Sequence, residues 1–151
     1  MKIILYRPQI PQNTGNIART CAAAGAGLGL VHPLGFSLQS RHLKRAGLGY
    51  WEALSVESIE DLLSYLETQS SFFFFSSKAK AVYTEASYTK DSLLVFGAET
   101  EGLPEIFWEK WPERFFTIPM TPKTRCLNLA SSVAVVLYEG LRQSGWASIS
   151  Q

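Results

Sequence analysis

Five short runs of apolar residues constrain the fold of this 151-residue chain more than any other feature. A strand that lies in a parallel sheet, covered on both faces, is apolar along most of its length. Helical patterns separate the runs, and strands that alternate with helices predict an α/β fold with a parallel sheet flanked by helices. The expected strands are Ile3–Tyr6, Leu28–His32, Phe72–Ser76, Leu93–Phe96 and Phe115–Ile118.

Capping and stop signals give the approximate bounds of the helices. Asn13 or Thr14 can cap a helix that runs to about Ala24, where Gly25 can end it. A short basic segment, Ser40–Ala46, follows the second expected strand.

Three further helices are expected in the rest of the chain. Ser58–Asp61 resembles a capping arrangement, and it opens a helical pattern made of Ile59, Leu62, Leu63 and Leu66. Pro104 suits the first turn of a short helix through Trp108. Asn128 begins the last helix, which has apolar residues at helical spacing.

The length predicts a single domain over residues 1–151, which can bury a core without disulfide bonds or a structural metal. The longest nearly uncharged apolar run, Cys21–Val31, is too short to span a membrane. Arg7 interrupts the first apolar stretch too early for a signal peptide. Cys21 and Cys126 show no metal-ligand spacing. We therefore expect a soluble cytoplasmic protein that binds neither a membrane nor a metal.

Charge is unevenly distributed along the chain. Residues 1–51 carry six Lys and Arg and no Asp or Glu, residues 52–113 carry twelve acids against four bases, and residues 114–151 carry four bases against one acid. A basic face of this kind attracts polyanions such as RNA. A solvated arrangement, in which the acids simply fall on the middle helices, is equally compatible with the sequence.

Three loop segments are candidates for a ligand site, because ligands of parallel α/β sheets bind beyond the carboxyl ends of the strands. Each is rich in Gly, Pro, Asn or Thr, and each lies between an expected strand and a helix start. They are Pro8–Asn16, Gly97–Pro104 and Pro119–Leu127, and we refer to them together as the rim segments.

The residues in and beside these segments form three motifs, Asn13–Arg19, Phe96–Pro104 and Ile118–Ser132. In this order and spacing they resemble the motifs of the SPOUT methyltransferases, which methylate RNA with S-adenosyl-L-methionine (AdoMet). The resemblance covers essentially the whole chain. It is strongest to the minimal tRNA 2′-O-methyltransferases that act at wobble position 34.

The resemblance implies a deep trefoil knot in the C-terminal third and methyl transfer from AdoMet, without a metal, to the ribose 2′-hydroxyl of nucleotide 34, a cytidine or modified uridine. It places AdoMet at seven residues of the chain: Phe75, Gly97, Gly102, Ile118, Cys126, Leu127 and Asn128. Cys126 stands where the family more often has Ser. Gly97 and Gly102 suit close backbone approach and positive φ.

The resemblance also makes Arg19 the catalytic residue, either as a base or as a group that positions the ribose and stabilises developing charge. It implies a homodimer with Tyr138 near the interface and the anticodon stem-loop of tRNA as partner. The residues expected to bind this substrate are Asn13, Asn16, Arg41, Lys44 and Arg45, and Tyr50 and Trp51 follow the basic segment as possible stacking aromatics.

Several alternatives stay open. The basic segment can be a solvated helix face with core aromatics behind it. Glu99 and Glu101 are interpreted as solvated loop acids. The substrate can be ribosomal RNA, or the chain can be a catalytically weakened, knotted RNA-binding protein.

Overall fold

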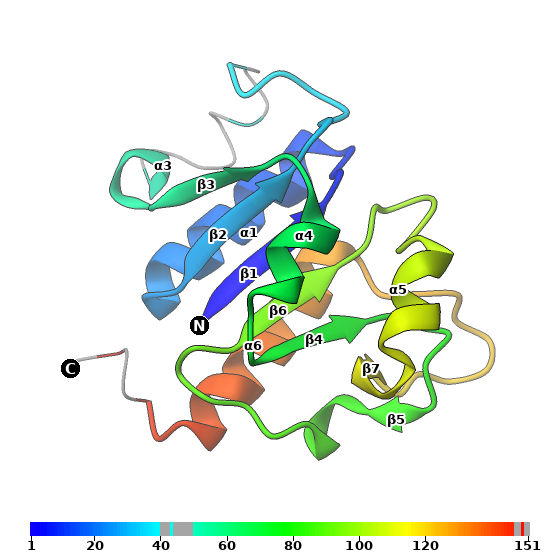
Figure 1. The fold of residues 1–151 in the computed structure, drawn as a ribbon. Coiled ribbons are helices and arrows are strands. Elements are labelled where there is room, and N and C mark those ends of the chain that lie inside the picture. The colour runs from blue at the N-terminus through cyan, green and yellow to red at the C-terminus, as the bar shows by residue number, and fades with distance from the viewer. Residues whose placement is uncertain (40–42, 44–49, 147–148, 150–151) are drawn as a thin grey trace.

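The apolar runs form a parallel sheet of seven strands in the computed structural model of the chain (Figure 1). The structure describes residues 1–39, 43, 50–146 and 149, and of residues 52 and 53 only the backbone. The strand order is β3-β2-β1-β6-β4-β7-β5, and every neighbouring pair is parallel. The strands are β1 Lys2–Tyr6, β2 Gly27–Val31, β3 Val56–Ile59, β4 Phe72–Phe75, β5 Ala81–Val82, β6 Leu93–Phe96 and β7 Phe115–Thr117.

All five expected strands are confirmed, with ends shifted by at most one residue. The sequence missed the two edge strands. β3 has the sequence Val-Glu-Ser-Ile, which is too polar to resemble a buried strand, and its Ile59 was wrongly assigned to the following helix. β5 has only two residues, too few for any periodic signal.

Helices cover both faces of the sheet. They are α1 Pro11–Ala24, α3 Tyr50–Ala53, α4 Leu62–Glu67, α5 Glu105–Lys110 and α6 Leu129–Gln143, with short 3-10 turns at Tyr83–Glu85 and Pro112–Arg114. α1 and α6 pack on one face, where Ile17 and Leu137 join the core around Ile3. α4 and α5 lie on the other face, where Figure 1 shows α4 in front of β6. Among the described helices, none is long and apolar enough to cross a membrane.

The expected helix ends are confirmed where a local hydrogen bond defines them. Gly25 ends α1 in the left-handed conformation, with φ 62°. At α4 the expected capping segment Ser58–Asp61 is only partly confirmed, because Ser58 lies in β3 and the cap is Asp61, which accepts hydrogen bonds from Leu63 N–H and Ser64 N–H. Asn128 caps α6 in the same way. α5 begins directly after Pro104, as expected, and runs two residues beyond the expected end.

The start of α1 differs from the prediction. The helix begins at Pro11, so Asn13 and Thr14 lie inside its first turn and are not its caps. Proline suits the first helical position because its missing N–H would have no partner there. The free N–H groups just before this turn find an acceptor elsewhere in the molecule, on Glu99. The trefoil knot and the single-domain boundary stay predictions.

Candidate active site

Glu99 joins the first two rim segments. Its carboxylate accepts hydrogen bonds from Gln9 N–H at 2.8 Å, from Ile10 N–H at 3.1 Å and from the Asn13 side-chain amide at 3.2 Å. A carboxylate at a helix N-terminus satisfies free N–H groups and interacts favourably with the helix dipole. Glu99 is thus the acceptor at the start of α1, and its interpretation as a solvated loop acid was wrong.

Asn13 connects this pair to Asn128, which directly follows the third rim segment. Its side-chain oxygen, Oδ1, accepts a hydrogen bond from the side-chain amide of Asn128 at 2.9 Å. The Asn128 oxygen meanwhile accepts from Ala130 N–H at 2.9 Å as the cap of α6. Asn13 is only 7% exposed whereas Asn128 is exposed, so the interaction is partly buried. The three rim segments therefore meet through a network of Asn13, Glu99 and Asn128, which we call the rim network.

Two glycines define the loop after β6. An antiparallel bridge closes it, with hydrogen bonds of 3.1 and 2.9 Å between the backbones of Ala98 and Gly102. A Cβ on Gly97 would lie 2.4 Å from the carbonyl carbon of Gly102, so no larger residue fits without moving the backbone. Gly102 has φ 71°, as expected, but a Cβ there would meet nothing within 4 Å. The limit at Gly102 is therefore conformation and not crowding.

The residues expected to hold AdoMet cluster at one edge of the sheet. Strand register places Phe75 beside Phe96 and Phe116, so that Gly97 and Ile118 follow at the carboxyl ends of three adjacent strands. The Phe75 ring is buried and stacks on Phe96 at a centroid distance of 4.9 Å. Its side chain is therefore part of the core beneath the loops that follow these strands.

Beyond these strands, Cys126 and Leu127 are exposed beside the Asn128 cap. A cofactor with an adenine ring and a charged tail needs apolar surface next to free backbone and polar groups. The exposed Leu127, the half-buried Ile118 and the open side of Gly102 supply this combination, so the residues present fit AdoMet.

Arg19 is exposed on α1 and lies apart from the rim network. The centre of its guanidinium lies 5.6 Å from the centroid of the Tyr50 ring, in a cation–π contact. Asn16 is also exposed. Arg41, Lys44 and Arg45 lie outside the described residues. Tyr138 is 43% exposed on α6.

The other thiol of the chain is part of the core. Cys21 is fully buried in α1, and burial raises the pKa of its thiol to about 12. A thiol in this state is not a nucleophile at neutral pH. Among the described residues, no group of three or more His, Cys, Asp or Glu could hold a metal ion.

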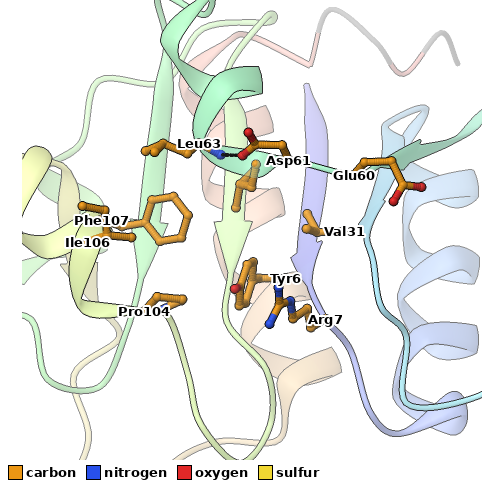
Figure 2. A pocket seen from close by; sticks show the side chains of 10 residues that line it. Tyr6, Arg7, Val31, Glu60, Asp61, Leu63, Pro104, Ile106 and Phe107 are labelled. Carbon is orange, nitrogen blue, oxygen red and sulfur yellow. Dashed lines mark hydrogen bonds between the residues drawn. The ribbon is translucent and has the colours of Figure 1, made fainter.

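A separate hollow of about 190 Å³ opens between α4, α5 and the end of β1 (Figure 2). Its lining is mostly apolar, with Tyr6 and Phe107 on its walls and the acids Glu60 and Asp61 at its margin. Arg7 lies beside Tyr6, with its guanidinium centre 5.1 Å from the ring centroid. The hollow is smaller than typical cofactor pockets of about 300 Å³ or more, and carboxylates repel phosphates. We therefore place the candidate chemistry on the rim segments.

Two features of the site were missed or left open by the sequence. Glu99 was interpreted as a solvated acid, and its role was missed because its partners lie about ninety positions away along the chain. The Gly-Ala-Glu sequence directly after a buried strand was the available signal. The role of the two aromatics after the basic segment was left open. Trp51 is half-buried and packs on the core, whereas Tyr50 is 39% exposed and lies on the surface.

Comparison with known proteins agrees with this geometry. The chain is 40% identical to the tRNA (cytidine(34)-2'-O)-methyltransferase of Escherichia coli (strain K12) over 149 residues, which is 97% of this chain and 95% of the relative. A solved structure described as giving structural insights into the 2-OH methylation of C/U34 on tRNA superposes with a TM-score of 0.87. It is 42% identical, and the match covers 94% of each chain.

A more distant solved structure contains a bound cofactor. The AdoMet-bound rRNA methyltransferase from Sinorhizobium meliloti superposes with a TM-score of 0.82 at 27% identity, over 93% of this chain and 55% of the longer one. Residues 1–138 match the SpoU rRNA Methylase family. Because this match spans the whole sheet, all three rim segments and most of α6, the chain belongs to the SpoU rRNA Methylase family.

Proposed function

We propose that this protein transfers a methyl group from AdoMet to the ribose 2′-hydroxyl of nucleotide 34 of tRNA. The observation that carries the proposal is the rim network, which joins three loops at the carboxyl edge of a parallel sheet, where such folds bind ligands. The full-length similarity to proteins named for this reaction supports the choice of substrate.

The proposed AdoMet site uses the loop after β6, the segment after β7 and the start of α6. Backbone groups around Gly97 and Gly102 would hydrogen-bond the cofactor, and Ile118 and Leu127 would cover its apolar part. The remaining proposed contacts are Phe75 from below, and Cys126 and Asn128 at the third rim segment. AdoMet supplies a methyl group already activated by a sulfonium, so the transfer requires no metal.

The proposed catalytic residue is Arg19. A guanidinium retains its proton at ordinary pH, so we assign it the positioning of the ribose and the adjacent phosphate. It would also stabilise the negative charge that develops on the attacking oxygen, while the hydroxyl proton leaves to water or to a phosphate oxygen. Asn16, exposed one turn earlier on α1, is the proposed direct substrate contact on this helix. Asn13, also expected to bind the substrate, is buried with its side-chain amide hydrogen-bonded to Glu99 and Asn128, so we assign it the positioning of the loops around the substrate.

The anticodon stem-loop would contact the acid-free N-terminal third, including Arg41, Lys44 and Arg45. A chain of this size offers limited surface for such a substrate, which favours a homodimer. Three exposed apolar side chains on or just after α6 support that interface: Val135, Tyr138 and Trp146. The Tyr138 and Trp146 rings contact each other with centroids 6.1 Å apart. A tRNA substrate also implies a cytoplasmic location.

The test is methyl transfer by the purified protein to an unmodified tRNA transcript, with labelled AdoMet and a chelator present. The expected product carries one methyl group on the ribose of nucleotide 34. The matched control is the same tRNA with a single 2′-deoxy nucleotide at position 34, which should accept no label.

Two other outcomes would contradict the proposal. Label on a ribosomal RNA fragment but not on tRNA would identify a ribosomal RNA 2′-O-methyltransferase. AdoMet binding without transfer to either RNA would identify a catalytically weakened RNA-binding protein.

A further inference from the structure

Tyr50 covers the guanidinium of the proposed catalytic residue. It is the first residue of α3, and its ring centroid lies 5.6 Å from the guanidinium carbon of Arg19. Both side chains are exposed, and Tyr50 retains 39% of its accessible surface. The pair therefore lies on the surface of α1, accessible to a large ligand.

The backbone of Tyr50 is fixed by its neighbours. Trp51 and Leu54 are half-buried and pack against the core that contains Ala18 and Cys21 of α1. This packing holds α3 against α1 while Tyr50 points outward. The ring is thus presented by an anchored turn of helix.

Two other arginines, Arg114 and Arg142, are held in a different way, whereas Arg7 lies over the Tyr6 ring at 5.1 Å much as Arg19 lies over Tyr50. Arg142 donates two hydrogen bonds of 2.8 Å, from Nε and from one terminal nitrogen, to the two carboxylate oxygens of Glu139. Arg114 lies over the Phe72 ring at 4.0 Å but also donates to the Phe72 carbonyl at 3.2 Å. Among the residues that the structure describes, Arg19 has neither a carboxylate within 4.0 Å nor a hydrogen-bond acceptor.

An aromatic ring attracts a cation through its face and accepts none of the in-plane N–H groups that recognise phosphate and hydroxyl oxygens. A guanidinium held in this way is restrained in orientation and keeps its donors free. We propose that Tyr50 is a positioning residue that orients Arg19 toward the ribose and phosphate of the bound nucleotide. This inference rests on the proposed function, because it acts through Arg19.

Removal of the ring should slow the chemical step and leave cofactor binding unchanged. RNA binding removes water from the pair, so Tyr50→Leu should lower the single-turnover rate at saturating AdoMet and tRNA by about 5- to 30-fold. Tyr50→Phe keeps the ring and should retain the rate within about twofold. The AdoMet dissociation constant should equal that of the parent in both variants. Tyr50→Gln gives a second ring-less variant should the Leu variant fold poorly.

A double-mutant cycle tests whether Tyr50 acts through Arg19. Tyr50→Leu in an Arg19→Ala background should lower the rate no further than Arg19→Ala alone. The matched control is Tyr65→Leu, which removes a ring lying 6.0 Å from the Lys2 ammonium on the other face of the sheet, and which should retain the parent rate.

Three outcomes would overturn the inference. They are a parent-like rate for Tyr50→Leu, a weaker tRNA affinity with an unchanged rate, and a full additional loss in the Arg19→Ala background. A weaker tRNA affinity with an unchanged rate would show that Tyr50 contacts RNA directly. A full additional loss in the Arg19→Ala background would show that Tyr50 acts independently of Arg19. Failure of the proposed function has a different signature, since the parent protein would then leave nucleotide 34 of tRNA unmethylated.

Discussion

Two polar networks at opposite edges of the sheet use similar hydrogen bonds but join different kinds of segment. The rim network connects three loops through Asn13, Glu99 and Asn128, and its acceptor carboxylate also binds two backbone N–H groups. The network at the amino edge connects two strands and a helix, with contacts of 2.6 to 3.2 Å among Lys2, Glu57 and Tyr65.

The difference lies in what else holds each region in place. β1 and β3 are already fixed by backbone hydrogen bonds to β2, so the amino-edge network adds to an arrangement that would persist without it. The rim loops have few such bonds, and their relative position depends on side chains. Disruption of the rim should therefore affect ligand binding, whereas disruption of the amino edge should affect stability alone.

The largest difference in AdoMet affinity is expected between substitutions at two glycines. Gly97→Ala places a Cβ 2.4 Å from backbone at the rim, and we expect it to abolish AdoMet binding. Gly27→Ala places a Cβ 3.3 Å from the flexible Lys2 side chain at the amino edge, and we expect parent-like binding. Calorimetric titration of both variants with AdoMet measures the difference. Equal affinities would show that the loop after β6 is not the cofactor site.

A second contrast compares two carboxylates. Glu99→Gln removes the charge that accepts three hydrogen bonds at the rim, and each hydrogen bond to a charged group contributes about 1.5 to 3 kcal/mol. If the AdoMet-bound protein loses the free energy of about one such hydrogen bond, AdoMet binding should weaken by at least tenfold. Glu57→Gln should leave AdoMet affinity unchanged. A Glu99→Gln variant with parent affinity would make the rim network purely structural.

The smallest expected effect is the pH dependence at the amino edge. The hydrogen bond from Lys2 lowers the pKa of Glu57 below its usual value near 4.5. A lowered pKa in the folded state stabilises the protein above the unfolded pKa, and this contribution is lost as the pH falls toward the folded value. The pair is partly exposed, so we expect under about 1 kcal/mol.

Thermal unfolding of the parent and Glu57→Gln measures this contribution. The parent should melt slightly higher at pH 7, and the gap should narrow as the pH falls below about 4.5. A gap that widens on acidification would contradict the assignment.

Local signals in the sequence predicted more of the fold than of the site. Asn128 was predicted as a cap because its acceptors and donors are adjacent in sequence, and the Phe72–Phe75 run was predicted as a strand because it is buried on both faces. The helix start at Pro11 was missed because its acceptor, Glu99, is distant in the chain.

The contact between Tyr50 and Arg19 could not be predicted for the same reason. The sequence could identify Tyr50 as an aromatic near a basic segment, but its contact with Arg19 depends on the packing of α3 against α1. A contact between residues thirty-one positions apart on two helices leaves no periodic or capping signal. The chemistry of such a site is therefore visible only after the fold has brought the segments together.

The proposed catalytic role of Arg19 is tested most directly by single-turnover methyl transfer with the Arg19→Ala variant, unmodified tRNA and saturating AdoMet. Loss of a preorganised cation at the reacting oxygen should lower the rate on the order of a hundredfold or more. AdoMet affinity should stay equal to that of the parent, because Arg19 lies outside the rim network. A rate within threefold of the parent would show that Arg19 is a surface charge and would contradict the proposed mechanism.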